Sequence, residues 1–299
     1  MKKITVIGGF TLNDSQKNRL ESLGEVSFIT SPKSSEEWLS LVSGADVILS
    51  NGDYLLENLY NLKNVFITYP YIEIGNFDSK KLEANNVLIA NTRGSNRNSI
   101  VEWVMFSTLA LFRNFLPAVN AKEDVPFALT QSLEGKKVLI VGKGNIGTQV
   151  GSLCEAFGMK VDFFYKGDNL KNKSADADLI VNCLNCNPTS ENLLNEEFFM
   201  SLKPGSRFVS FVRQYTYDLG ALLKSLDNNI LGGVAIDCDP EIPGDTKNDF
   251  YQKLFKHEKV LVTPHIAFST QQAKINGIET AIQNIESYMS GNPQNILKK

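Results

Sequence analysis

Three glycines with a fixed spacing are the first feature of this 299-residue sequence that points to a particular chemistry. Gly142, Gly144 and Gly147 follow the apolar run Lys137 to Val141 and precede a stretch whose apolar residues have helical spacing. Between a strand and a helix, such glycines allow a tight turn, close approach of a pyrophosphate to the backbone, and close helix packing. The pattern therefore predicts a dinucleotide-binding loop.

The end of the next strand bears on which nicotinamide cofactor this loop prefers. An acid about twenty residues after the first glycine commonly binds the ribose hydroxyls. That count reaches Asp162, which falls inside the predicted strand, whereas the carboxyl end of the strand offers Tyr165 and Lys166. A strand end with a cation and no carboxylate favours NADP over NAD, although Asp162 or Asp168 can still reach the ribose. Nearby lysines either add positive field or are solvated surface residues: Lys143, Lys171 and Lys173.

Two histidines are the candidates for a proton donor, because hydride transfer to a ketone needs an acid that works near neutral pH. His257 lies in the charged segment Lys256-His257-Glu258-Lys259, which is typical of a solvated turn. His265 follows the buried run Val260 to Val262, at the carboxyl end where open α/β sheets bind ligands. We expect His265 to be the acid, with a structural role at the strand end as the alternative.

The four cysteines indicate neither a disulfide framework nor a metal site. Cys183 and Cys186 form a CxxC pair, but no second pair or nearby histidine accompanies them. We therefore predict no metal.

Composition excludes several other classes of protein. Hydrophobic residues make up 42% of the chain and charged residues 21%, which is ordinary for a globular protein and argues against disorder. The net charge of -3 argues against a nucleic-acid partner. No apolar run approaches the roughly 20 residues of a membrane helix. We expect a protein that is soluble and cytoplasmic.

The elements that must position these residues are short apolar runs, each followed by a segment with helical spacing. Runs of this kind suit strands that are buried on both faces of a parallel sheet, so the fold class is α/β. The predicted strands are Ile4 to Ile7, Val47 to Leu49, Val65 to Ile67, Val87 to Ala90, Val138 to Val141, Val161 to Tyr165, Leu179 to Val181, Phe208 to Phe211, Val234 to Ile236 and Val260 to Val262.

A polar segment from Asn91 to Asn98 separates the first four strands from the rest, and we interpret it as a crossing between domains. After it, Ser99 and Glu102 have the spacing of a capping box at the start of a helix that runs to about Pro117. That helix is apolar nearly all round, which is typical of either an interface or a central core helix. A final amphipathic helix is expected from about Thr270 to Met289.

The chain resembles the D-2-hydroxyacid dehydrogenases, which include phosphoglycerate, glyoxylate and D-lactate reductases. The resemblance covers most of the sequence. Its most specific stretches are Asn91-Thr92-x-Gly94-x-Asn96 with Ser99 and Glu102, Leu133-Glu134-Gly135-Lys136, Phe157-Gly158-Met159-Lys160-Val161, Leu202-Lys203-Pro204-Gly205, Arg213 with Asp218, Gly233 to Asp237, and Thr263-Pro264-His265-Ile266-Ala267.

The resemblance implies two Rossmann-like doubly wound domains with a cleft between them. Residues 94–267 would bind NAD(P), and residues 1–93 with 268–299 would form the substrate domain. It implies that Arg213 holds the substrate, that His265 is the acid/base, and that a carboxylate supports the histidine. Glu241 fits that carboxylate if one residue is deleted, and Asp239 is the rival. Cofactor contacts carry over to Asn145, Ile146, Leu184, Asn185, Ser190, Val212 and Asp237, while Tyr165 replaces the customary ribose aspartate.

The sequence departs from the family pattern at two places. Glu73 stands in the substrate loop where a glycine is expected, and Gln214 and Tyr215 replace paired glycines after the arginine. The resemblance predicts a homodimer that transfers a hydride between a nicotinamide cofactor and a 2-oxo or D-2-hydroxy acid. The presence of Arg213 and His265 favours this enzymatic activity, while the altered substrate loop favours the alternative, a catalytically weak NAD(P)-sensing protein on the same scaffold.

Overall fold

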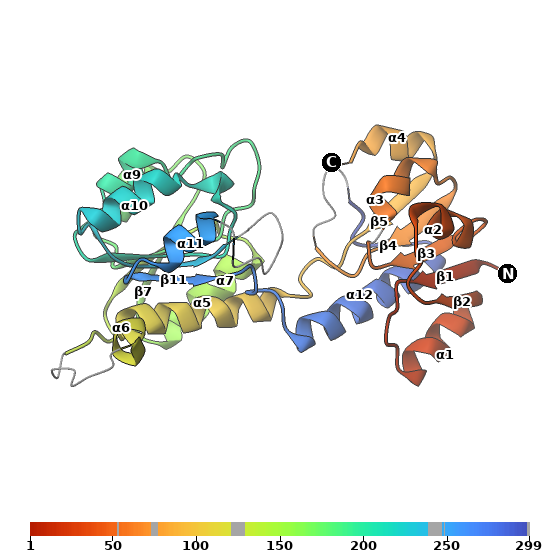
Figure 1. Cartoon of the computed structure of the whole chain (residues 1–299), viewed down its shortest axis with the longest axis horizontal. Helices are drawn as coiled ribbons and strands as arrows, with labels where there is room; N and C mark the ends of the chain where they lie inside the picture. Colours follow the sequence, from red (N-terminus) through yellow and green to blue (C-terminus); the bar gives the residue numbers. More distant parts are fainter. Residues whose placement is uncertain (53, 73–76, 121–128, 239–246, 248, 298–299) are drawn as a thin grey trace. The chain divides into compact units, whose positions relative to one another are not determined.

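The computed structural model describes residues 1–52, 54–72, 77–120, 129–238, 247 and 249–297. They form two units, each with its own parallel sheet (Figure 1). Unit 1 comprises Met1–Asn96 and Gln271–Lys299, and unit 2 comprises Arg97–Thr270. The prediction of an α/β fold with two doubly wound parallel sheets is confirmed.

The sheet of unit 1 has the strand order β2-β1-β3-β4-β5, and every neighbouring pair is parallel. Its strands are β1 (Lys3–Ile7), β2 (Glu25–Ile29), β3 (Val47–Ser50), β4 (Val65–Thr68) and β5 (Val87–Ala90). Its helices are α1 (Asp14–Leu23), α2 (Ser35–Leu41), α3 (Leu55–Asn58), the 3-10 helix η1 (Leu59–Asn61), α4 (Ser79–Ala84) and α12 (Gln271–Met289).

Helices cover both faces of the unit 1 sheet because its strands are apolar on both sides. Trp38 of α2 and Leu82 of α4 pack into one core, and Leu20 of α1 and Ile282 of α12 pack into the other. The final helix of the chain therefore completes the unit that the first residues begin. Helix α12 was expected from about residue 270 to residue 289, and its observed range confirms this.

The sheet of unit 2 has the strand order β11-β10-β9-β8-β6-β7, again with parallel neighbours. Its strands are β6 (Lys137–Val141), β7 (Lys160–Phe164), β8 (Leu179–Asn182), β9 (Ser206–Ser210), β10 (Leu231–Asp237) and β11 (Val260–Thr263). Strand β6 lies between β7 and β8, so the direction of winding reverses beside it. This is the switch point at which open α/β sheets form a ligand crevice.

The helices of unit 2 again form a layer on each face of the sheet. They are α5 (Arg97–Phe112), α6 (Phe115–Asn120), α7 (Asn145–Ala156), α8 (Leu170–Ser174), α9 (Glu196–Met200), the 3-10 helix η2 (Gln214–Thr216), α10 (Leu219–Asp227) and α11 (Asp249–Phe255). One core contains Val150 of α7 and Val104 of α5, and the other contains Phe199 of α9 and Leu222 of α10.

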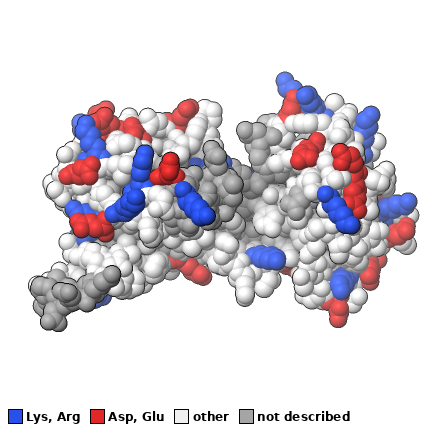
Figure 2. Space-filling model, in the orientation of Figure 1, with Lys and Arg blue, Asp and Glu red and all other residues white. Residues whose placement is uncertain are grey.

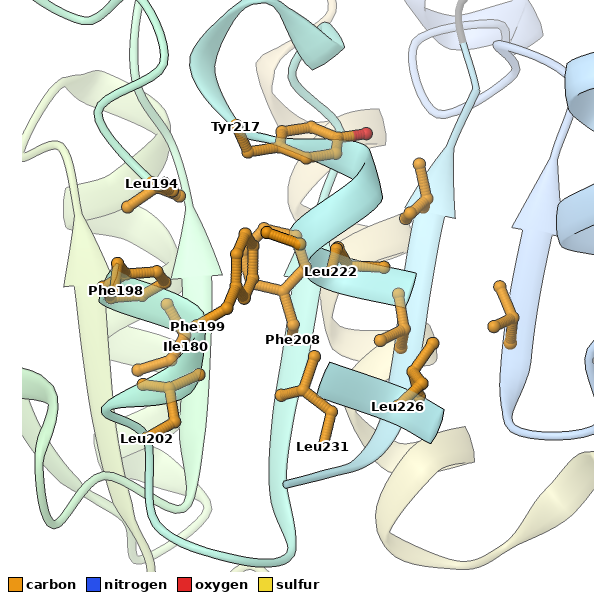
Figure 3. Close-up of a cluster of buried hydrophobic side chains, with 14 of the residues drawn as sticks. Ile180, Leu194, Phe198, Phe199, Leu202, Phe208, Tyr217, Leu222, Leu226 and Leu231 are labelled. Carbon is orange, nitrogen blue, oxygen red and sulfur yellow. The ribbon is translucent and has the colours of Figure 1, made fainter. Parts of the chain in front are cut away.

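Four aromatic rings form a continuous edge-to-face series in the second of these cores (Figure 3). Phe198, Phe199, Phe208 and Tyr217 follow one another with ring centroids 5.1, 5.4 and 5.7 Å apart. Such pairs stabilise a core by about 0.5–1.5 kcal/mol each beyond the area they bury. Tyr217 comes directly after η2, so this series anchors the loop that contains Arg213.

The helix that follows the polar crossing differs from its sequence prediction at both ends. Helix α5 begins at Arg97, so Ser99 lies inside it, and the Ser99 hydroxyl pairs with Thr270 Oγ1 at 2.7 Å. The predicted capping box is therefore wrong. The helix ends at Phe112, because Asn114 adopts a left-handed backbone conformation with φ of 47°. Most of its side chains are buried in unit 2, as expected of a core helix, while Phe106 is 51% exposed.

Candidate active site

Candidate site residues follow the carboxyl ends of neighbouring strands in unit 2. Because all strands of the sheet are parallel, these ends meet at one edge. Strand β10 ends at Asp237, and from β11 to β7 the other strand ends are followed by His265, Arg213, Leu184, Gly142 and Tyr165. The edge thus has the acid and the arginine toward one end and the glycine loop toward the other.

The glycine loop leaves space for a phosphate group at the switch point. A Cβ at Gly142 would lie 2.5 Å from the carbonyl oxygen of Cys183. A Cβ at Gly147 would lie 2.1 Å from the carbonyl oxygen of Gly142. Gly144 instead faces open space, with nothing within 4 Å of an added Cβ, and no side chain caps the helix N-terminus there. Two glycines thus permit close backbone packing, and the third leaves an open approach to the start of α7. These features fit a dinucleotide pyrophosphate.

Two residues at the start of α7 were expected to contact the same phosphates. Asn145 is exposed, and Ile146 is half-buried against the apolar core beneath the helix. The exposed position of Asn145 leaves its side chain accessible beside Gly144.

The end of strand β7 has a cation and an aromatic ring where the ribose acid was sought. Lys143 Nζ donates a hydrogen bond to the Tyr165 hydroxyl at 2.9 Å and lies 4.7 Å from the centre of the Phe163 ring. Tyr165 is 48% exposed, and the adjacent Lys166 is exposed. Within the described residues, no side chain pairs with Lys166. One cation therefore contacts the Tyr165 hydroxyl, and a second, Lys166, follows Tyr165 in the chain.

Both carboxylates that remained rivals for the ribose are bound to one lysine. Lys173 Nζ lies 3.0 Å from both carboxylate oxygens of Asp162 and 3.4 Å from Asp168 Oδ2. Asp168 also accepts a hydrogen bond from the Tyr165 amide at 2.9 Å.

The loop after β8 contains the residues expected beside the adenosine. The amide of Leu184 donates to the side-chain oxygen of Asn182, a buried residue whose amide group also bonds Thr216. The Ser190 hydroxyl is buried and donates to the carbonyl oxygen of Asn185 at 2.5 Å. Ser190 therefore closes this loop, while the Asn185 side chain stays exposed.

The loop after β9 presents Arg213. Val212 is buried, and its amide bonds the Ser210 hydroxyl at 3.2 Å, whereas Arg213 is exposed. The hydroxyl of Thr216 donates to the carbonyl oxygen of Arg213 at 3.1 Å. A buried network thus holds the backbone at the position where the guanidinium extends from the sheet edge.

The residues that replace the family glycines lie in the helical turn directly after the arginine. Gln214 and Tyr215 are both exposed, and the Tyr215 hydroxyl donates to Glu191 at 3.2 Å.

Asp237 is buried at the end of β10, and its carboxylate accepts three hydrogen bonds. Oδ1 accepts from the Thr263 hydroxyl at 2.6 Å and from the Ile266 amide at 2.9 Å, and Oδ2 accepts from the Ala267 amide at 2.8 Å. Burial raises the pKa of this carboxyl, while the three donors oppose that shift. All three donors flank His265 in the chain, so Asp237 fixes the loop that contains the histidine.

The histidine itself is half-buried and has a strained backbone. His265 has φ of 55°, a left-handed conformation that costs a residue with a Cβ about 1–2 kcal/mol. Its ring contacts that of Phe268 edge-on, with centroids 5.2 Å apart. The second histidine, His257, accepts a hydrogen bond from the amide of Lys259 at 3.2 Å, which agrees with its interpretation as part of a turn.

Three predicted residues lie outside the described part of the chain. They are Glu73 of the substrate loop and the two rivals for the support of His265, Asp239 and Glu241. Their roles stay predictions.

Part of the expected substrate loop is described in unit 1. The buried Asn284 of α12 donates from its amide to Thr68 Oγ1 at 3.3 Å and to the carbonyl oxygen of Asn91 at 2.8 Å. The side-chain amide of Asn91 in turn donates to the carbonyl oxygen of Ile72 at 2.7 Å. The backbone amide of Thr92 donates to the carbonyl oxygen of Tyr71 at 3.1 Å. A chain of amide groups thus connects α12 to residues 71 and 72.

The sequence analysis did not identify Trp103 and Thr263, which help to hold the loop that contains His265. Trp103 Nε1 donates to Thr263 Oγ1 at 3.1 Å, and that hydroxyl donates to Asp237. The one sequence feature that could have indicated this contact is the hydroxyl of Thr263, two residues before His265. Its partner Trp103 lies 160 positions away in the chain, so spacing could not reveal the pair.

The described residues contain neither a metal-binding cluster nor a membrane-spanning helix. They contain no group of three or more His, Cys, Asp or Glu side chains arranged to bind a metal ion. None of their helices has both the length and the apolar character that a membrane crossing requires.

Cys183 of the CxxC pair is buried, and burial raises the pKa of its thiol. On the face drawn in Figure 2, cationic and anionic side chains are interspersed on each unit.

Comparison with known proteins agrees with this geometry. Residues 105–267 match the family model described as D-isomer specific 2-hydroxyacid dehydrogenase, NAD binding domain. D-3-phosphoglycerate dehydrogenase of Escherichia coli (strain K12) is 30% identical over 253 residues, which are 78% of this chain and 61% of that protein. The chain thus spans about three fifths of the length of these curated relatives.

Other relatives match a larger share of their own length. D-lactate dehydrogenase of Lactiplantibacillus plantarum is 27% identical over 277 residues, 82% of each chain. The crystal structure of the D-isomer specific 2-hydroxyacid dehydrogenase from Lactobacillus delbrueckii ssp. bulgaricus, in its NAD complexed form, superposes with a TM-score of 0.81 at 18% identity. It covers 99% of this chain and 100% of its own, so the whole fold is shared.

Proposed function

The chain belongs to the D-isomer specific 2-hydroxyacid dehydrogenase family, and from this premise we propose that it transfers a hydride between a nicotinamide cofactor and a 2-oxo or D-2-hydroxy acid. One observation carries the proposal: the glycine loop, Arg213 and His265 all follow carboxyl ends of one parallel sheet. Adjacent strands are about 4.8 Å apart, so the ends of β9 and β11 lie roughly 10 Å from each other. A small acid can contact side chains from both.

Each residue has a definable task in this reaction. A bound reduced nicotinamide supplies the hydride. Arg213 binds the substrate carboxylate and polarises the carbonyl group with its fixed charge. His265 donates a proton to the oxygen that becomes the hydroxyl, and takes it back in the reverse direction. Glu241 is proposed to support His265, the role that the resemblance gives it, with Asp239 as the rival.

The glycine loop supports binding of the cofactor independently of the catalytic residues. The open space at Gly144 and the uncapped N-terminus of α7 offer amide groups to a pyrophosphate. We propose that Leu184, Asn185 and Ser190, in the loop after β8, contact the adenosine. Val212 and Asp237, after β9 and at the end of β10, are proposed to lie near the nicotinamide. This order follows the order of the strands along the sheet edge.

We propose further that NADP is preferred to NAD. Tyr165 and Lys166 stand at the end of β7, and Lys143 bonds the Tyr165 hydroxyl, so a 2′-phosphate would meet two cations there. The carboxylates of Asp162 and Asp168 are already bound to Lys173.

Unit 1 is the proposed substrate domain, and the active form is proposed to be a cytoplasmic homodimer. Curated relatives named D-3-phosphoglycerate, D-lactate and glycerate dehydrogenases support a small 2-hydroxy acid as substrate. Phe106 of α5 and Phe115 of α6 are 51% and 45% exposed, with ring centroids 6.4 Å apart. An exposed aromatic pair of this kind favours an interface between subunits.

Turnover of a panel of 2-oxo acids tests the proposal. Glyoxylate, pyruvate and hydroxypyruvate are each mixed with NADPH or NADH, and the loss of reduced nicotinamide is followed by absorbance. We expect oxidation of the cofactor by at least one acid, formation of the D enantiomer of a chiral product, and faster reaction with NADPH. Cofactor binding without turnover of any acid would contradict the enzymatic role and favour the sensing alternative.

A further inference from the structure

Lys173 occupies a position in unit 2 that neither the glycine loop nor the catalytic residues explain. It lies in the five-residue helix α8, and its side chain is 27% exposed. Its ammonium group contacts both oxygens of Asp162, Asp168 Oδ2 and, at 2.9 Å, the carbonyl oxygen of Phe163. The two carboxylates raise the pKa of Lys173, so the group stays charged.

These contacts meet at the end of β7, where a cofactor ribose would lie. The Tyr165 amide donates to Asp168 Oδ2 at 2.9 Å, and the Asp168 amide donates to the Tyr165 carbonyl oxygen at 3.0 Å. This reciprocal pair holds Asp168 in the turn beside the Tyr165 ring. Lys173 Nζ is itself 5.8 Å from the centre of that ring. The carboxylate of Asp168 is therefore next to the ribose position, where it is paired with the ammonium group that also binds Asp162.

We propose that Lys173 is a specificity-determining residue for the cofactor, acting by pairing with the Asp168 carboxylate beside the ribose position, so that this carboxylate neither repels a 2′-phosphate nor binds a ribose hydroxyl. The inference rests on the proposed function, since it assigns a role within the cofactor site. Lys173 acts through Asp168 and is therefore a positioning residue. Without Lys173, Asp168 would be an uncompensated anion that repels a 2′-phosphate and accepts a hydrogen bond from a ribose hydroxyl.

The other charges at this strand end do not take over this role. Lys143 is committed to the Tyr165 hydroxyl and the Phe163 ring. Lys171, two residues before Lys173 on the same helix, pairs with Glu197 at 3.5 Å. Among the described residues, Lys173 is thus the cation in contact with Asp168.

Titration of the full-length protein with NADPH and with NADH tests the inference. The quantity measured is the ratio of the two dissociation constants in the parent, in Lys173→Met and in the double variant Lys173→Met/Asp168→Asn. We expect Lys173→Met to shift the ratio toward NADH by about tenfold, the effect of one uncompensated charge near the phosphate. We expect Asp168→Asn in the same chain to reverse most of that shift.

A matched control is Lys171→Met, which removes a lysine from the same helix and should leave the ratio unchanged. If Lys173→Met does not fold, Lys173→Gln keeps a long polar side chain without the charge and carries the same expectation.

The outcomes separate this inference from the function on which it rests. An unchanged ratio in Lys173→Met would overturn the inference alone. A loss of NADPH affinity that Asp168→Asn does not reverse would also overturn it, because Lys173 would then bind the phosphate directly. Failure of the parent protein to bind either cofactor would overturn the proposed function and the inference together.

Discussion

Replacing Asp237 with Asn tests whether this buried carboxylate holds the loop that contains His265. The two side chains have nearly the same size, so the change removes charge and acceptor capacity without leaving a cavity. The carboxylate accepts from the Thr263 hydroxyl, the Ile266 amide and the Ala267 amide. An asparagine offers one acceptor oxygen and one NH2 group, so at least one buried donor must face another donor.

The expected cost follows from this hydrogen-bond geometry. A buried donor left unsatisfied costs about 1–3 kcal/mol, and hydrogen bonds to a charged acceptor are worth more than those to a neutral amide. Part of this cost is offset, because burial raises the pKa of Asp237 and the neutral amide avoids burying a charge. We expect unit 2 to lose about 2 kcal/mol of stability.

Turnover should be the more sensitive measurement. His265 has a left-handed φ of 55°, and the hydrogen bonds to Asp237 oppose relaxation of that loop. A displacement of about 1 Å at a catalytic group can reduce turnover roughly a hundredfold. We therefore expect turnover to fall between about tenfold and a hundredfold, with the dissociation constant of the cofactor changing less.

Urea unfolding and steady-state kinetics provide the two readouts. Asp227→Asn is the matched control, since Asp227 is on the same unit with its side chain 75% exposed. Unchanged stability and turnover in Asp237→Asn would refute the reasoning. Loss of turnover at unchanged stability would also refute it, because the loop would then not depend on the hydrogen bonds to Asp237.

Four further predictions concern the remaining parts of the molecule. His265→Asn should lower turnover by about 10² to 10⁴ with near-normal cofactor affinity, and a variant with half the parent rate would contradict the acid role. Lys166→Asp should narrow or reverse the preference for NADPH in direct titrations, so tighter binding of NADPH by the variant would contradict it. Asn284→Leu should raise the KM for the 2-oxo acid and leave the cofactor dissociation constant unchanged, because it frees the loop at residues 71 and 72; an unchanged KM would exclude that link. Burial raises the pKa of Glu279, but hydrogen bonds from Arg19 and Gln16 outweigh it and hold that pKa below its usual 4.5. The pair of Arg19 and Glu279 should therefore stabilise unit 1 above pH 4.5 and lose its effect as the pH falls below that value. Thermal unfolding across this pH range should show a smaller acid-induced loss in Arg19→Met, and equal losses in both proteins would contradict the assignment.

The sequence predicted the sheets well where strands are buried on both faces. All ten predicted apolar runs coincide with strands, and the glycine loop joins a strand to a helix as expected. The missed element is β2, Glu25–Ile29, whose side chains are exposed or half-buried at the edge of the sheet beside β1. An edge strand of this kind lacks the continuous apolar run on which the prediction depended.

The error at Ser99 has a similar physical origin. A serine followed three residues later by a glutamate has the spacing of a cap, but this hydroxyl bonds Thr270, which lies 171 positions away. The spacing of residues in the sequence cannot show that the Ser99 hydroxyl bonds Thr270 instead of a backbone amide at the start of the helix. The helix consequently begins two residues earlier, at Arg97.

The carboxylates near the ribose position show most clearly what the sequence leaves open. Strand periodicity places Asp162 inside β7 and Asp168 in the turn after it, and from that information either could reach a ribose hydroxyl. The structure turns both toward Lys173, because α8 begins at Leu170 and its short turn brings position 173 back over the strand end. The pairing of both acids therefore depends on the position of a five-residue helix, and residue spacing alone does not determine that contact.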